Sequence, residues 1–419
     1  MDRPARIRLA GMIAATVTCA AVATEASAQD GSIVLNEQLQ LGDVIAGQTL
    51  NVEDAQEQVT VTTYAQGTHA AGAVQNGSVA VISTQTMSGS ARASTVMDLG
   101  GDTQGIVNAT TQAGGNYLAV GAYDADLDIE AVQILNGTEV RASSAINGGT
   151  ARLLSGGSVG VSAIGNTTAL GGSGSVVTGS VDQYASATVR ASNYAATQYI
   201  PAEAGFTSQA LGNAVAVNSD ANSGQNLTVG QITTSNLIEA DTSANAGNAW
   251  NLAARAHAGA NQAVLANQGG SMVVTTDQTN GAYVRAAAVA TAYDYGSATA
   301  YARGAGNEVS AGNNDIYLEI DNTQFNSGGV DVSASFAGTN GYDAYVGADA
   351  VGNSVTGYAC SECAGQINAT NNQVNQGHVT ATAQTTVAGS GRAVITGANA
   401  VGNSASFYVT RPTCDTDCH

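Results

Sequence analysis

The chain has 419 residues, including 51 glycines and only 3 prolines, with 5% aromatic and 11% charged residues and a formal net charge of -20 at pH 7. Nucleic acids and anionic membrane surfaces bind basic faces, so this acidity argues against both as partners. The few aromatic and charged residues argue against a large aromatic core and against salt-bridged helices. The even composition predicts one elongated body.

Residues 1–28 have the features of a secretory signal peptide. Three arginines precede an apolar run from Leu9 to Val22, and the Ala-Ser-Ala at 26–28 is an A-x-A cleavage site. A lipoprotein signal ending at Cys19 is the alternative, which Thr18 disfavours. The apolar run is shorter than the ~20 residues that a membrane helix needs. We therefore expect an exported mature protein that is soluble or peripherally attached.

Two marker series recur every 46 to 50 residues along the chain and define a repeat of about 48 residues. The first is an asparagine that follows glycine or alanine, at Asn116, Asn166, Asn213, Asn261, Asn307, Asn353 and Asn403. The second follows a Val-Arg-Ala-Ser-like segment, at Ala93, Ala142, Ala191, Ala240, Ala286, Ser333 and Ala381. The repeats span 91–410, with a degenerate repeat or cap at 29–90 and a cysteine-containing tail at 411–419.

Alternation within a repeat is that of β-strands, since side chains two residues apart share a face. Val284, Ala286 and Ala288 lie on one face of such a segment, with Tyr283 and Arg285 on the other. Inward positions are small, so continuous backbone ladders must supplement a narrow core. The pattern predicts an all-β, right-handed or curli-like β-solenoid.

The two marker series lie 20 to 24 residues apart, which predicts that each repeat contains two coils of about 24 residues. Markers one repeat apart are then expected about 9.6 Å apart, and seven repeats give a rod of roughly 70 Å. The Gly-Asn pairs are interpreted as repeat corners, because both residues tolerate positive φ. Stacked asparagines at these corners would hydrogen-bond along the axis.

No catalytic motif accompanies the four histidines His69, His257, His378 and His419. Four arginines recur in one register of the repeat, at Arg92, Arg141, Arg190 and Arg285. A recurring register indicates a surface column rather than a unique catalyst. We predict no enzymatic activity and no cofactor, the alternative being a β-helical polysaccharide-active enzyme.

Acidic residues and cysteines form two further clusters. Asp124, Asp126, Asp128 and Glu130 would share one strand face; a solvated acidic strand is favoured over a calcium site, because the glycine-rich calcium-binding nonapeptide is absent. Four mature cysteines form two close pairs, Cys360 with Cys363 and Cys414 with Cys418, and export favours disulfides among them. A zinc site using these cysteines, or three of them with His419, is the alternative.

The whole pattern resembles the holdfast attachment protein D family. The resemblance rests on the Ala-Ser-Ala signal, on the segments Ala350-Val351-Gly352-Asn353-Ser354 and Ala400-Val401-Gly402-Asn403-Ser404, and on the cysteine-bearing tail. It implies a structural protein that anchors an adhesive polysaccharide, the holdfast, to the outer membrane. It also implies a curlin-like co-anchor protein and a curli-type secretion lipoprotein as partners.

Repetition predicts multivalent polysaccharide binding, since weak contacts add along a polymer. The contacts expected are the arginine column together with Tyr283, Tyr293 and Tyr301, because arginine pairs with acidic sugars and tyrosine packs on sugar faces. An open solenoid end also predicts self-association of an amyloid-like kind. The alternative function is a general adhesin or a curli-like fibre subunit, although a curli unit is about half as long as this repeat.

Overall fold

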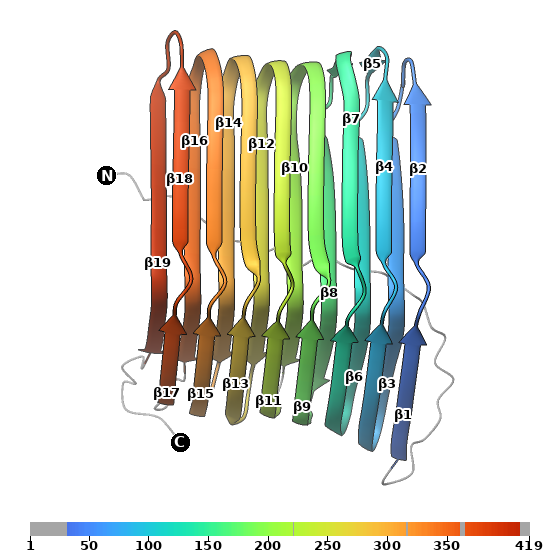
Figure 1. The fold of residues 1–419 in the computed structure, drawn as a ribbon, viewed down its shortest axis with the longest axis vertical. Coiled ribbons are helices and arrows are strands. Elements are labelled where there is room, and N and C mark those ends of the chain that lie inside the picture. The colour runs from blue at the N-terminus through green and yellow to red at the C-terminus, as the bar shows by residue number, and fades with distance from the viewer. Residues whose placement is uncertain (1–31, 221, 316, 361–364, 411–419) are drawn as a thin grey trace, which may run out of the picture.

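The computed structural model describes residues 32–220, 222–315, 317–360 and 365–410, and these residues form a β-solenoid without helices. Each coil has a short lower front strand, an upper front strand, a turn at the upper tip and a back leg that returns to the lower tip (Figure 1). The signal peptide, the tail and Cys363, Cys414 and Cys418 lie outside the described residues.

Nineteen strands form this coil path (Figure 1). The lower front strands that stand alone are β1 (Ser32–Gln40), β9 (Val176–Ala185), β11 (Gly224–Thr233), β13 (Met272–Asn280), β15 (Tyr317–Asn326) and β17 (Gln366–Asn375). The separate upper front strands are β2 (Val44–Val52), β4 (Ala91–Leu99), β7 (Glu139–Leu153) and β18 (Val379–Val387), with β5 (Asp102–Thr103) at the tip.

The remaining strands supply the back legs. Back legs alone are β8 (Gly157–Ser173) and β19 (Ala393–Thr410); β3 (Val59–Met87) and β6 (Val107–Leu135) continue into the next lower front strand. Upper front strand, tip and back leg are continuous in β10 (Thr188–Asp220), β12 (Leu237–Asn267), β14 (Tyr283–Asn313) and β16 (Val330–Cys360). The six separate lower strands and the ends of β3 and β6 mark eight coils in the described chain.

All coils stack in parallel, and each residue pairs with the one a single repeat further on. Asn116 pairs with Asn166, and Ala93 pairs with Ala142. The β-solenoid is therefore confirmed, but the prediction of two coils in each repeat is wrong: one repeat is one coil. Markers one repeat apart are direct neighbours at about 4.8 Å, so eight coils stack to roughly 38 Å.

The half-period spacing that suggested two coils has another cause. Ala93 lies in the upper front strand β4, whereas Asn116 lies in the back leg that begins β6. The two series thus mark opposite legs of one coil. The second series also slips by one residue near its end, because Ala286 pairs with Val332 and Ser333 pairs with Ala287.

Alternation buries one face of each leg in the inner coils. Val284, Ala286 and Ala288 face inward and are fully buried, as the alternation predicts. The interior contains two hydrophobic clusters, an alanine-rich one between the upper legs and a valine- and leucine-rich one between the lower legs. Residues 32–90 follow the same coil path as the later repeats.

Candidate functional site

The seven marker asparagines form a hydrogen-bonded ladder between the two hydrophobic clusters. Asn116 Nδ2 donates to Asn166 Oδ1 at 2.8 Å, and the same bond recurs from each asparagine to the next as far as Asn403 at 2.8 to 2.9 Å. The second N–H crosses the core, as where Asn166 Nδ2 donates to the Tyr184 carbonyl oxygen at 2.9 Å. The asparagines therefore stack along the axis as expected. Their second N–H groups also join the back leg to the lower front strand.

These asparagines do not adopt the positive φ that we expected of corner residues. The described non-glycine residues with positive φ are Asn76, Asp124 and Asn222. The marker asparagines lie within strands, next to a second residue that also faces inward. Six of the seven follow a glycine, which suits the close packing there: a Cβ on Gly165 would lie 2.3 Å from the Gly212 carbonyl oxygen, although Ala260 holds this position before Asn261.

A glutamine ladder on the lower front strands is a feature that sequence reasoning missed. It contains Gln38, Gln85, Gln133, Gln183, Gln231, Gln278, Gln324 and Gln373, one from each coil, with Nε2 to Oε1 distances of 2.7 to 3.0 Å. The spare N–H of each donates to a back-leg carbonyl, as from Gln133 to Thr167 at 2.8 Å. These glutamines recur at the period of the marker series, so the signal was present.

The predicted arginine column exists, but most of its charge is neutralised. Arg92, Arg141 and Arg190 are ladder neighbours on the outer face of the upper front strands, and Glu239 follows in the next coil. The Glu239 carboxylate lies 2.5 Å from Arg190 Nη2 and 2.8 Å from Arg285 Nη1. Arg92 contacts Glu139 at 2.5 Å and Asp43 at 3.3 Å. Among the described residues, Arg141 is the member of the column with no ion pair.

The three predicted tyrosines are not brought together. Tyr283 lies beside the arginine column, is 43% exposed and donates to Asp331 Oδ2 at 3.0 Å. Tyr301 lies on the back leg, where burial and the hydrogen bond to Asp349 raise its pKa to about 12. Tyr293 lies at the upper tip and is 62% exposed.

The upper tip carries an exposed aromatic row that sequence reasoning also missed. Trp250, the single tryptophan, is 55% exposed and meets Tyr342 edge to face with ring centroids 6.1 Å apart. The rings come from coils two apart, and Gly296 of the coil between them leaves the space that the indole covers. The Arg392 guanidinium lies 5.4 Å from the Tyr342 ring centroid and is held by Asp343 at 2.9 Å. The row is an exposed aromatic surface that ends in the ion pair of Arg392 and Asp343.

A charged cluster lies on the outer side of the back leg. Arg303 forms an ion pair with Glu308, and Gln262 Nε2 donates to Glu308 Oε2 at 3.2 Å. His257 is the ladder neighbour of Arg303, and its buried Nε2 has no hydrogen-bond partner among the described residues. Burial and the Arg303 charge lower the pKa of His257 to about 4. The imidazole is therefore neutral at pH 7.

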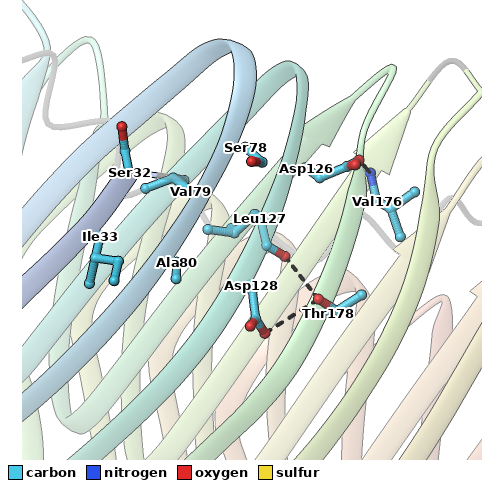
Figure 2. A pocket seen from close by; sticks show the side chains of 10 residues that line it. All are labelled: Ser32, Ile33, Ser78, Val79, Ala80, Asp126, Leu127, Asp128, Val176 and Thr178. Atoms are coloured by element: carbon cyan, nitrogen blue, oxygen red, sulfur yellow. Dashed lines mark hydrogen bonds between the residues drawn. The ribbon is translucent and has the colours of Figure 1, made fainter. Parts of the chain in front are cut away.

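A shallow depression of about 550 Å³ lies on the lower front face of the first four coils (Figure 2). Asp126 and Asp128 line it, and both face outward on β6 as the acidic-strand prediction expects. Asp126 Oδ1 accepts from the Val176 N–H at 3.2 Å, and Asp128 Oδ1 accepts from Thr178 Oγ1 at 3.4 Å. The acidic side chains therefore bond to the next coil.

Within the described residues, no cluster of three or more histidine, cysteine or acidic side chains is positioned to hold a metal, and no helix has the length and apolarity to span a membrane. Cys360 ends β16 and is half-buried. Since the other three cysteines lie outside the described residues, their disulfides stay a prediction.

The family model of holdfast attachment protein D matches residues 53–329, more than half of the chain. The chain belongs to the holdfast attachment protein D family. Neither the curated proteins nor the solved structures contain a match. Membership assigns this chain to holdfast attachment, a role at the cell surface.

The residues matched by the holdfast attachment protein D family contain the central part of both amide ladders, the arginine column and Trp250. Tyr342, Arg392 and the last coil lie beyond the matched range. The aromatic row therefore extends from the region common to the family into the C-terminal coils of this chain.

Proposed function

We propose that this chain is an exported anchor that holds an adhesive polysaccharide, the holdfast, at the outer membrane. The observation that carries the proposal is the family match over residues 53–329. The architecture supports it, because stacked coils present the same outer faces many times, and weak contacts to a polymer add through multivalency. A structural rather than an enzymatic role is part of the proposal.

The polysaccharide contact that we infer is the aromatic row at the upper tip. Trp250 and Tyr342 are 55% and 51% exposed, and sugar rings pack on aromatic side chains of this kind. Arg392 lies against the Tyr342 ring and is paired with Asp343, so it adds hydrogen-bond donors to the row rather than an uncompensated charge. Tyr293 lies at the same tip. In the arginine column, Arg141 has no ion pair with any described residue and could contact an anionic group, whereas its neighbours Arg92 and Arg190 are paired with carboxylates.

The proposal includes the partners that family resemblance implies. A curlin-like protein would act as co-anchor, and a curli-type secretion lipoprotein would deliver both chains to the surface. A general adhesin remains the second candidate function, and the open ends of the sheet favour a fibre subunit as its specific form.

The test is holdfast retention by cells. A deletion strain should export its adhesive polysaccharide normally yet shed it into the medium. Complementation with the Trp250→Ala, Tyr342→Ala double variant should restore surface protein but leave most of the polysaccharide in the medium. Tyr123→Ala is the matched control, because Tyr123 is 53% exposed at the opposite tip, and it should restore retention fully.

Two results would count against this proposal. Loss of polysaccharide synthesis in the deletion strain would indicate a biosynthetic role instead of an anchor. Retention by the double variant at the level of the Tyr123→Ala control would remove the aromatic row as the contact while leaving the anchor role in place.

A further inference from the structure

We propose that the last coil of one copy stacks in register on the first coil of a second copy, so that copies assemble head to tail into a filament. Both ends of the described sheet are open. The first coil exposes Ile33 (66%), Leu35 (74%) and Ile45 (67%), and the last exposes Ile395 (57%) and Tyr408 (66%). This assembly goes beyond anchoring and does not depend on the polysaccharide.

The two ends match each other in register along all three legs. Gln373 and Gln38 are the terminal members of the glutamine ladder, and the two residues are 335 positions apart. Val379 and Val44 begin the upper front strands β18 and β2 and have the same separation. On the back legs, Asn403 and Thr68 are the ends of the asparagine ladder and again are 335 positions apart. The last coil therefore fits the first without a register shift.

The two amide ladders run in opposite directions and leave complementary groups at the ends. Each glutamine donates to the preceding coil, so Gln373 Oε1 has no donor among the described residues, whereas Gln38 retains one N–H beyond its bond to His69. Each asparagine donates to the following coil, so Asn403 Nδ2 faces the open end and the Thr68 hydroxyl oxygen can accept. Head-to-tail contact pairs these donors with acceptors, while contact between two first coils would oppose donor to donor.

Charge also differs between the ends. Strands β17, β18 and β19 contain no aspartate or glutamate, and the loops between them carry His378 and Arg392. The first coil is acidic, with exposed Glu37, Asp43, Glu53, Asp54 and Glu57. The same separation of 335 positions places His378 beside Asp43 and Arg392 beside Glu57. Head-to-tail stacking places the acidic first coil against an end that carries Arg392 and has no aspartate or glutamate in its strands, whereas stacking of two first coils would bring acids together.

The open edges present backbone groups for pairing. Val44 N donates to Ser90 O and Gly100 N donates to Val52 O, so these members of β2 bond the second coil and the N–H of Gly47 faces the open side. On β18, Ala388 N donates to Gly338 O, so the N–H of Ala383 faces the opposite open side. Unpaired edges of this kind template another strand, and a heterologous contact that does not close forms a filament.

Proline at either edge tests the proposal, because it removes an outward donor without breaking an internal bond. Gly47→Pro blocks the first coil, where a Cβ would meet nothing within 4 Å, and Ala383→Pro blocks the last. Natively exported, full-length mature protein is analysed by size-exclusion chromatography with light scattering and by electron microscopy. The unsubstituted chain should form filaments that lengthen by about 38 Å per copy. Each variant alone should be monomeric, and an equimolar mixture should form dimers.

The mixture also shows that both variants fold, since each must supply one intact end. Dimers of Ala383→Pro alone would indicate contact between two first coils and would overturn the proposal. A monomeric unsubstituted chain at the concentrations used would overturn it as well, and would indicate that the ends are covered by the chain's own tail or by another protein.

Cysteine cross-linking checks the register. Gly47 and Thr382 have the 335-residue separation, both are exposed, and neighbouring parallel strands place Cα atoms about 4.8 Å apart, within the disulfide range. Gly47→Cys mixed with Thr382→Cys should give a dimer on a non-reducing gel above the background of the unsubstituted chain. Gly47→Cys with Gln384→Cys, displaced by two residues to about 8 Å, should not. Equal cross-linking by both pairs, or by neither, would overturn the in-register stack while leaving holdfast retention as a separate result.

Discussion

Phe336 packs edge to face on Tyr295 of the preceding coil, with ring centroids 4.8 Å apart and ring planes at 78°. Both side chains are buried in a core that is otherwise built from alanine and valine in these two coils. Space for the two rings comes from Gly338 and Gly341, where an added Cβ would lie 2.7 Å from Phe336 and 2.5 Å from Tyr295 respectively. The aromatic pair and the two glycines therefore form one packing unit.

Gly341→Ala should destabilise the fold by about 2 kcal/mol through overpacking against Tyr295. Tyr295→Leu should cost about 2 kcal/mol alone, but the double variant should cost less than the sum, because the smaller side chain leaves room for the methyl group. Urea unfolding monitored by circular dichroism measures all three. Strict additivity would contradict this packing unit.

Gln231→Leu should destabilise the chain by roughly 2 to 4 kcal/mol, because it removes hydrogen bonds to Gln183, Gln278 and the Gln262 carbonyl inside a buried ladder. The change is again measured by urea unfolding. Gln104→Leu is the control, since the Gln104 side chain is exposed and no such bond is removed. A loss at Gln231 no larger than at Gln104 would show that the ladder contributes little to stability.

Gly165→Ala should cost about 2 kcal/mol, because the methyl group would meet the Gly212 carbonyl oxygen of the next coil. Gly160→Ala is the matched control on the same strand, β8, where a Cβ would meet only Thr207 Oγ1 at 3.7 Å, and it should be neutral or slightly stabilising. Melting temperatures distinguish the two. Ala260 holds the equivalent position in another coil, so the loss of stability should be moderate. Equal stability of both variants would refute the steric explanation.

Stability should fall as the pH is lowered from about 6.5 to about 4, because His257 binds a proton in the unfolded chain before it does so in the folded one. A folded pKa near 4 corresponds to a loss on the order of 3 kcal/mol across this window. His257→Gln should flatten this part of the pH profile of the melting temperature. The control His69→Gln changes an exposed histidine and should leave the slope intact. An unchanged slope in His257→Gln would assign the effect to other groups.

The repeat period and the inward positions were predictable, because inward and outward residues alternate along the strands, as Ala286 and Ala288 do, even where a large residue such as Phe336 takes an inward position. The number of residues in a coil was not predictable. Ala93 and Asn116 are separated by half a period whether they lie on successive coils or on opposite legs of the same coil. Only pairing of strands distinguishes the two cases, and pairing depends on contacts 46 to 50 residues away.

The candidate polysaccharide contact was partly predictable. Tyr293 was expected, but Trp250 and Tyr342 belong to different coils and meet only because Gly296 leaves space between them. The arginine column was expected from its register, yet the substitution of Glu239 into that column changes its electrostatics. A single residue that departs from the repeat is hard to recognise in a periodic sequence. Such residues nevertheless determine the local contacts and charge.

The direction of the ladder bonds determines how the molecule bears a load. Backbone and amide hydrogen bonds join coil to coil, so pulling along the strands shears a whole row of them together, whereas pulling along the stack opens one coil boundary at a time. If the protein is held at its lower tip, traction applied at the upper tip, where Trp250 and Tyr342 lie, runs along the strands. A cell held by this tip would therefore load the protein in its mechanically strong direction.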